Sequence, residues 1–400
     1  MRVLYFSKDY TSHDHRFLAA LAQTDHQVFY LRLECSPRQV EDRPVPSKIT
    51  QIPWEGGKRP FRWQDTPRLL RGLRGVIRRF KPDLIHAGPI QTCAFLAVLS
   101  GFQPILTMSW GFDLMQDADN NRWWQWVTRY VLRRTTFFTS DAEVTRDRAI
   151  AFGVPRQRTV VFPWGVDLQN FTPKRSRPPT IGSRQKAREF VLLCNRSWEP
   201  RYGVDVLARA FVKAVHQRPE IYLMLLADGS QSNLLRQILT NGGVMERVHF
   251  GGRISQTKLP RYYHMADLYI SASHVDGSSV SLMEALACGL PVLVSDIPAN
   301  REWVTDGLNG WLFPDGDADT LAAAIVRSYD NRKKLAGIGH AARRVAEEKA
   351  EWTKNFQKLL DAYKLAVTWH FPASKERLQR WSSQSPRKSH QKGKNNLIES

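Results

Sequence analysis

The sequence predicts an α/β protein built from two doubly wound, Rossmann-like domains, each with a parallel sheet. Three observations support this fold class. Short apolar runs alternate with amphipathic segments early in the chain, which is typical of parallel strands joined by crossover helices. A polar, proline-bearing segment divides the chain at residues 173–188. With 400 residues, two domains are expected rather than one.

Composition bounds the class of protein further. Hydrophobic residues make up 42% of the sequence, which is enough for ordinary globular cores. No apolar run approaches the roughly 18 residues of a transmembrane helix, and the residues after Met1 read as a first strand rather than a signal peptide. The four cysteines have no metal-ligand spacing, so we expect reduced thiols in a cytoplasmic protein.

The formal net charge of +20 favours an anionic partner. Phosphate groups, nucleic acid and anionic lipid headgroups all carry the required charge. No nucleic-acid recognition motif accompanies the basic residues, so we do not expect nucleic acid as a partner. Part of the charge lies in residues 371–400, a basic segment with few apolar residues that we expect to be disordered.

The first domain is predicted to cover residues 1–172. Its expected strands are Val3–Phe6, Val28–Leu33, Leu84–His86, Ile105–Met108, Thr136–Thr139 and Thr159–Phe162. Arg68–Phe80 has the spacing of an amphipathic helix with arginines on its polar face. This helix suits either an anionic membrane surface or a core-facing crossover. The indole-rich segment Arg122–Trp126 suits either contact with lipid or sugar, or ordinary helix packing.

The second domain is predicted to cover residues 189–350, after the linker at residues 173–188. Its expected strands are Glu189–Cys194, Ile221–Ala227, His249–Phe250, Leu268–Ile270 and Leu290–Val294. A last helix at residues 351–370 is predicted to cross back onto the first domain. Asp317 and Asp319 have the spacing of a metal-binding pair, but they precede a helix, where capping is the simpler interpretation. We therefore expect no metal.

One strand–loop–helix–strand unit, Ser271–Pro298, carries the clearest chemical signal. Its loop contains Gly277 and two serines, and a helix is expected from about Val280 to Cys288. The loop lies at the carboxyl end of a strand, where open parallel sheets bind ligands. Unpaired amide groups and the helix dipole favour an anion such as phosphate at this position.

Two acidic residues, Asp276 and Glu284, flank this loop. A carboxylate can accept hydrogen bonds from two hydroxyl groups at once, so such a pair suits a sugar ring. The alternative is purely structural, because Ser281 and Glu284 fit a capping box and Asp276-Gly277 is a common turn. The spacing alone leaves both interpretations open.

The stretch Asp276–Val292 resembles the donor motif of retaining, nucleotide-sugar-dependent glycosyltransferases with the GT-B fold, of the family 4 or group 1 type. The usual motif has a second glutamate where this chain has Asp276, followed by the run Ala-Met-Ala-x-Gly-x-Pro-Val. The resemblance covers residues 162–313 and is looser in the first domain. It implies two Rossmann-like domains facing a central cleft, a nucleotide-diphosphate sugar as co-substrate, and no obligatory cofactor or metal.

Several positions match donor-binding residues of that family. Arg196 matches the arginine that holds the donor diphosphate, and the family lysine falls on Arg201 or Tyr202. Glu284 would bind ribose hydroxyls and Asp276 those of the transferred sugar. The expected catalytic residues are therefore Arg196, Arg201, Asp276 and Glu284. The other expected donor-binding residues are Arg253, Ile254, Gly277, Ser278 and Ser279.

On the acceptor side the chain departs from the family. Family members often have a glycine pair after the first strand and a His-Gly pair after the strand that ends here at Met108. This chain has His13 and Asp14 in the first loop, and Trp110 and Asp113 in the second. We expect these four residues on the acceptor side, with a solvated N-cap as the alternative for the first two.

The sequence thus predicts a retaining glycosyltransferase of the hexosyltransferase type, acting on a hydroxyl group of a glycan or lipid-linked acceptor. A lipid-linked acceptor at the inner membrane face would explain the basic charge and make a cytoplasmic protein peripheral to the membrane. The alternative is a catalytically inactive GT-B scaffold, which Asp276, Trp110 and the missing glycine pair favour.

Overall fold

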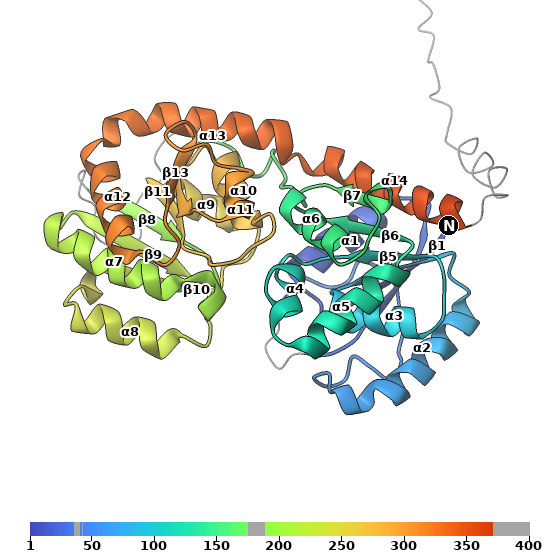
Figure 1. Ribbon diagram of the computed structural model, residues 1–400. Helices are drawn as coiled ribbons and strands as arrows, with labels where there is room; N and C mark the ends of the chain where they lie inside the picture. The colour runs from blue at the N-terminus through green and yellow to red at the C-terminus, as the bar shows by residue number, and fades with distance from the viewer. Residues whose placement is uncertain (36–40, 42, 175–188, 371–400) are drawn as a thin grey trace, which may run out of the picture.

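The computed structural model describes residues 1–35, 41, 43–174 and 189–370. The chain forms two domains, called here the first and the second lobe, and each has a parallel sheet with helices packed against it (Figure 1). The predicted fold class of two doubly wound parallel sheets is confirmed. Residues 175–188 of the predicted linker and the predicted tail at 371–400 lie outside the described residues.

The first lobe is built on a seven-stranded sheet with the order β3-β2-β1-β4-β5-β6-β7. All neighbouring strands of this sheet pair in parallel. The strands are β1 (Arg2–Ser7), β2 (Gln27–Arg32), β3 (Thr50–Gln51), β4 (Leu84–Gly88), β5 (Ile105–Met108), β6 (Phe137–Ser140) and β7 (Thr159–Val161). The six predicted strands are present, and the unpredicted β3 is very short.

The helices of the first lobe connect these parallel strands. They are α1 (Ser12–Leu21), η1 (Trp63–Asp65), α2 (Thr66–Phe80), η2 (Ile90–Ala94), α3 (Phe95–Leu99), α4 (Phe112–Met115), η3 (Asp117–Asp119), α5 (Arg122–Arg134), α6 (Glu143–Ala151) and η4 (Arg156–Arg158). Helix α2 buries Leu69, Leu73 and Val76 against the core, so its apolar face is that of a crossover helix. Its arginine face is left toward solvent.

The second lobe has a six-stranded parallel sheet with the order β10-β9-β8-β11-β12-β13. Its strands are β8 (Phe190–Cys194), β9 (Ile221–Leu226), β10 (Val248–Gly252), β11 (Leu268–Ser271), β12 (Val292–Ser295) and β13 (Gly310–Phe313). Its helices are η5 (Pro200–Tyr202), α7 (Val204–Gln217), α8 (Ser232–Asn241), η6 (Met245–Arg247), α9 (Leu259–Met265), α10 (Val280–Ala287), α11 (Pro298–Arg301), α12 (Ala318–Asp330), η7 (Arg332–Lys334) and α13 (Leu335–Lys349). Asp317 caps α12 by accepting from the amides of Asp319 and Thr320, both at 2.9 Å.

The last described helix, α14 (Trp352–His370), returns to the first lobe and lies along its sheet (Figure 1). Its Leu359, Ala362 and Tyr363 are fully buried in the same cluster as Val3 and Phe162. The Tyr363 hydroxyl lies 2.7 Å from Nδ1 of the buried His86 on β4. The end of the chain therefore completes the core of the first lobe.

The bond between Tyr363 and His86 predicts a measurable contribution to stability. Tyr363→Phe removes the hydroxyl and leaves a buried imidazole nitrogen without this partner, which costs about 1–3 kcal/mol of unfolding free energy. Urea denaturation measures that cost. As a control, Tyr222→Phe loses a hydroxyl whose 2.6 Å partner, Arg247, is 29% exposed and within reach of water, and we expect a change below about 0.5 kcal/mol. Equal losses of unfolding free energy in the two variants would show that the bond between Tyr363 and His86 contributes no more than a surface bond.

Candidate functional site

A loop at the carboxyl edge of the second sheet, residues 276–279, is called here the glycine loop. It connects β11 to α10, as the sequence predicts. The Oγ atom of Ser279 accepts a hydrogen bond from the Leu282 amide at 3.4 Å, so Ser279 is the N-cap of α10. The capping box of Ser281 and Glu284 is therefore not the arrangement found.

Arg196 and Asp276 form an ion pair at this edge. Nη2 of Arg196 donates to Oδ2 of Asp276 at 2.7 Å, and the two side chains are only 11% and 17% exposed. Nη1 of Arg196 donates to the hydroxyls of Ser279 at 2.7 Å and Ser281 at 3.2 Å. The guanidinium carbon lies 4.1 Å from the centre of the Tyr202 ring. Burial opposes the charge of Arg196, but the Asp276 carboxylate raises its pKa above the usual value.

One donor of this buried guanidinium stays unused. Among the residues that the structure describes, Nε of Arg196 is buried and has no hydrogen-bond partner. A buried charged N–H group without a partner is costly, so such groups are rare outside functional sites. The arginine can thus donate one more hydrogen bond, to an oxygen atom such as that of a phosphate.

Glu284 lies on α10 and is buried. Its Oε2 accepts from the Tyr263 hydroxyl at 2.8 Å, and its Oε1 accepts from Nε2 of Gln256 at 2.5 Å. Burial raises the pKa of Glu284, whereas Arg16 and these two hydrogen bonds act in the opposite direction. Each carboxylate oxygen still has a second lone pair available for a hydroxyl group.

The two candidates for the family lysine position have different surroundings. Tyr202 stacks on Arg196 within the second lobe. Arg201 reaches across to the first lobe, where its guanidinium carbon lies 4.6 Å from the centre of the Phe112 ring. Burial raises the pKa of Asp276, and the positive charges of Arg196 and Arg201 act in the opposite direction. Of the two residues, Arg201 brings positive charge toward the glycine loop.

The two other expected donor-binding residues lie farther along the same edge. Arg253 follows β10 and pairs with Asp228 at 3.0 Å, and both side chains are about half exposed. Ile254 is half-buried and packs against a cluster that includes Tyr263 and Leu282. Arg253 is therefore tied to a carboxylate at the surface rather than to the buried Arg196 network.

On the acceptor side, His13 and Trp110 come together. The His13 ring centre lies 6.1 Å from that of Trp110 and 4.7 Å from that of Trp164. Burial, helped by Arg16, lowers the pKa of His13 to about 3, so the imidazole is neutral. Among the described residues, Nδ1 of His13 and Nε1 of Trp110 are both buried without a hydrogen-bond partner.

The two acidic candidates of the first lobe are bound within their own loops. Asp14 closes a capping box with Thr11 at the start of α1 and also accepts from the Tyr5 hydroxyl at 3.1 Å. The N-cap itself is Thr11, and Asp14 is the buried third residue of the capping box, so the alternative of a solvated N-cap does not describe Asp14. Asp113 accepts from the Ser109 hydroxyl at 2.5 Å and from two backbone amides. Burial raises the pKa of each to about 6.

One residue of the site was not predicted. Asp141 follows β6 in the first lobe, and its Oδ2 accepts a 2.8 Å hydrogen bond from the amide of Ser278 in the glycine loop. Burial, with a contribution from Asp276, raises the pKa of Asp141 to about 8. Its place directly after a strand is the signal that singled out Asp113, so the same rule could have found it.

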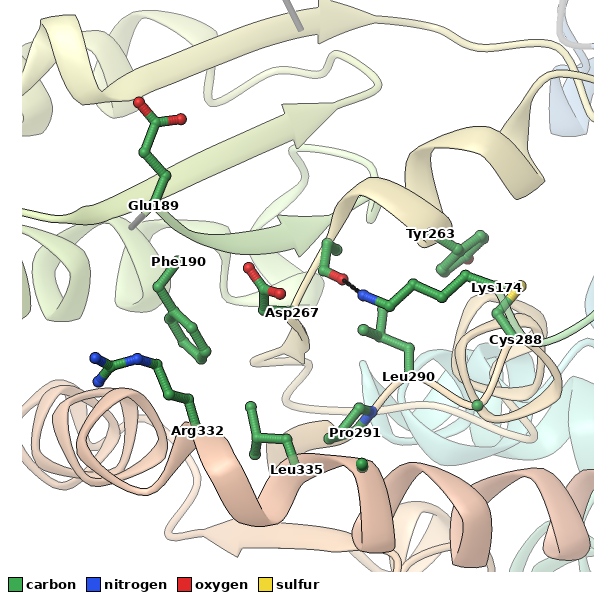
Figure 2. Close-up of a pocket in the computed structure, with 13 residues that line it drawn as sticks. Lys174, Glu189, Phe190, Tyr263, Asp267, Cys288, Leu290, Pro291, Arg332 and Leu335 are labelled. Atoms are coloured by element: carbon green, nitrogen blue, oxygen red, sulfur yellow. Dashed lines mark hydrogen bonds between the residues drawn. The ribbon is translucent and has the colours of Figure 1, made fainter. Parts of the chain in front are cut away.

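The opposite edge of the second sheet holds a separate cavity. It has a volume of about 360 Å³ and lies where β8, β11 and β12 begin. Figure 2 shows Lys174, Glu189, Cys288 and Arg332 on its wall. Its lining also includes Asp267 and Pro291, which, like Glu189, directly precede strands, so the cavity lies at the amino ends of the strands and is not part of the site at the glycine loop.

Two lobes that each have a parallel sheet are the architecture of the GT-B fold. Residues 12–170 match the family model described as Glycosyltransferase Family 4, and residues 181–345 match the model described as Glycosyl transferases group 1. The chain belongs to this glycosyltransferase family.

The relatives include two proteins of Mycolicibacterium smegmatis. A GDP-mannose-dependent alpha-(1-6)-phosphatidylinositol monomannoside mannosyltransferase is 29% identical over 59% of this chain and 65% of that protein. A phosphatidyl-myo-inositol mannosyltransferase is 30% identical over 51% of each chain. The chain thus spans about half to two thirds of the length of these curated relatives.

Solved structures show the same fold. HepE of Anabaena in complex with UDP matches with a TM-score of 0.70 and 18% identity, over 91% of this chain and 100% of that one. A sucrose-phosphate synthase from Thermosynechococcus elongatus matches with a TM-score of 0.76 and 17% identity, over 91% and 98%. At this level of identity the likeness establishes the fold.

The raised pKa of Asp141 predicts a pH dependence of stability. Because the folded chain holds the Asp141 proton more tightly than the unfolded chain, the stabilisation is present below the usual aspartate pKa and is lost as the pH rises toward about 8. The groups that set this pKa are Asp276, Asp113 and the Ser278 amide. Asp141→Asn cannot titrate, so its unfolding free energy should rise relative to that of the natural chain between pH 5 and 8.5, by about 1 kcal/mol or more. Urea denaturation across this range measures the difference, and a constant difference would refute the assignment.

Proposed function

We propose that this protein is a retaining glycosyltransferase that moves a hexosyl group from a nucleotide-diphosphate sugar to a hydroxyl group of a glycolipid acceptor. The observation that carries this proposal is the buried Arg196 with its unpartnered Nε atom. It lies beside the amino end of α10, where the helix dipole also favours negative charge. The names of the relatives support a sugar donor and an inositol-lipid acceptor.

In this proposal the protein acts by stabilising charge. Arg196, together with Arg201, neutralises the negative charge that grows on the leaving diphosphate. Glu284 holds the ribose hydroxyls of the donor, and Asp276 those of the transferred sugar. The leaving phosphate oxygen helps to deprotonate the acceptor from the same face, so no protein nucleophile is required. Neither a cofactor nor a metal ion is needed, and chelator-insensitive turnover is expected.

The proposed acceptor requires contact with a membrane surface. Helices α2 and α5 carry eight exposed arginines and no acidic residue: Arg71, Arg74, Arg78, Arg79, Arg122, Arg129, Arg133 and Arg134. Trp63, just before α2, packs edge-on against Trp123 and Trp124 of α5, so the two helices begin side by side. A group of exposed arginines of this kind attracts anionic lipid headgroups.

Exposed indoles accompany these arginines. Trp123 and Trp126 are 50% and 49% exposed, and they stack with Tyr130 in a row along α5. Tryptophan prefers the boundary between lipid and water, so this row suits insertion at headgroup depth. Among the described residues no helix is long and apolar enough to cross a bilayer. We therefore propose peripheral binding, at the cytoplasmic face of the membrane.

The donor chemistry is tested by incubating the protein with GDP- and UDP-sugars and an inositol-lipid acceptor, with and without a chelator. We expect nucleotide release that depends on the acceptor, and an anomeric configuration in the product equal to that of the donor. Arg196→Ala should lower kcat by about 10²- to 10³-fold, because one charged donor to the leaving group is lost.

Arg218→Ala is the matched control for this loss. Arg218 pairs with Asp330 at the surface of the second lobe and is remote from the glycine loop, so near-normal turnover is expected. Full activity of Arg196→Ala would refute the assigned role. Absence of nucleotide release from every donor would instead favour an inactive scaffold.

The membrane surface is tested with vesicles that contain or lack phosphatidylglycerol. The natural chain should float with anionic vesicles at low salt and less well at high salt, because the attraction is screened. Replacing Trp123 and Trp126 together by Ala should weaken binding by about tenfold through lost insertion. Leu308→Ala, which removes an exposed apolar side chain of the second lobe, should bind normally. Equal binding to neutral vesicles would contradict the arginine role.

A further inference from the structure

Two carboxyl groups join the lobes in a reciprocal arrangement. Asp141 of the first lobe accepts from the Ser278 amide at 2.8 Å, directly before the N-cap of α10 in the second lobe. Glu302 of the second lobe accepts from the amides of Glu143 at 3.0 Å and Val144 at 2.8 Å, in the first turn of α6 in the first lobe. Each lobe thus supplies an acceptor to the start of a helix in the other.

Helix α6 has no cap of its own. Its N-cap residue is Ala142, whose side chain cannot accept a hydrogen bond. The first amides of a helix have no partner within the helix, so they need an external acceptor. Glu302 meets this need from the other lobe, and water has to replace it when the lobes separate.

Atoms of both lobes surround Ser278. Its hydroxyl donates to the Asp141 carbonyl at 2.6 Å and accepts from the Trp303 indole at 3.1 Å. A Cβ atom on the neighbouring Gly277 would lie 2.5 Å from Oδ1 of Asp141, and one on Gly111 would lie 2.7 Å from the Gly277 amide nitrogen. The glycine loop is therefore held by first-lobe atoms as well as by its own lobe.

We propose that Asp141 and Glu302 are positioning residues that form a cross-lobe latch, which holds the glycine loop in its transfer-competent shape only when the lobes are closed. Asp141 holds the Ser278 amide directly by a hydrogen bond. Glu302 bonds to α6 and so helps to keep the lobes closed. The latch rests on the proposed transferase function for its purpose. Its existence is a property of the free protein and can be tested without any substrate.

Hydrogen exchange measured by mass spectrometry on the full chain tests this coupling. Glu302→Ala should speed exchange at the start of α6, where its hydrogen bonds are lost. It should also speed exchange of the glycine-loop amides about tenfold, although Glu302 accepts no bond from that loop, because both contacts require closed lobes. Asp141→Ala should have the same two effects. Asp141→Asn keeps an uncharged oxygen acceptor at Ser278 and should behave like the natural chain.

Asp330→Asn is the control, since Asp330 pairs with Arg218 within the second lobe and should leave both regions unchanged. Faster exchange confined to α6 in Glu302→Ala would overturn the latch. Nucleotide binding tests whether Asp141 forms a latch or instead occupies the donor site and competes with the nucleotide. GDP and UDP should bind Asp141→Ala within about twofold of the natural chain, whereas clearly tighter binding would show that Asp141 blocks the donor site.

The latch and the proposed transferase function can fail independently of each other. If the chain is a transferase, Asp141→Ala should lower kcat while the donor KM stays nearly constant, because the latch forms in the closed state only. Slow exchange in the natural chain with no transfer to any acceptor would leave the latch intact and reject the proposed function. Normal transfer by Glu302→Ala with unchanged loop exchange would reject the latch alone.

Discussion

The close approach of two glycine backbones sets the geometry between the lobes. Gly111 of the first lobe has φ +80° and lies against the amide nitrogen and Cα of Gly277 in the second. A side chain at either position would meet backbone or carboxylate atoms at less than 3 Å. Because both positions lack Cβ, the carboxyl edges of the two sheets can meet, which brings Arg201 over Phe112 and Asp141 to Ser278.

The edge formed in this way concentrates buried charge. Arg196, Asp276 and Glu284 are all shielded from water, and taking ionised groups out of water is costly. Each acid is offset by specific donors, whereas the arginine keeps one N–H group without a partner. A hydrophobic edge would be a simpler route to stability. The arrangement therefore suits a site that must receive an anion rather than a core that only has to be stable.

The sequence predicts the elements of this fold well because parallel strands are buried on both faces and appear as apolar runs. It misses β3, which has two exposed residues, and β13, whose Gly310–Phe313 run was not assigned. The glycine loop is predictable because glycine, serine and acidic residues are adjacent in the chain. The position of Asp141 directly after β6 marks it as a candidate, but the sequence does not reveal its partner, a backbone amide 137 residues away. A polar residue at the carboxyl end of a strand can face the site or bind within its own loop. The sequence does not show which of the two applies to Asp113.

The charge state of Asp141 reconciles the latch with a bound diphosphate. An ionised carboxylate at the Ser278 amide would repel a second anion held by Arg196 nearby. Burial and the neighbouring Asp276 raise the pKa of Asp141 to about 8, so near pH 7 the group is mostly uncharged. A neutral carboxyl oxygen still accepts from the amide. The glycine loop can then be held from the first lobe while the positive charge of Arg196 and the α10 dipole stay available to the leaving group.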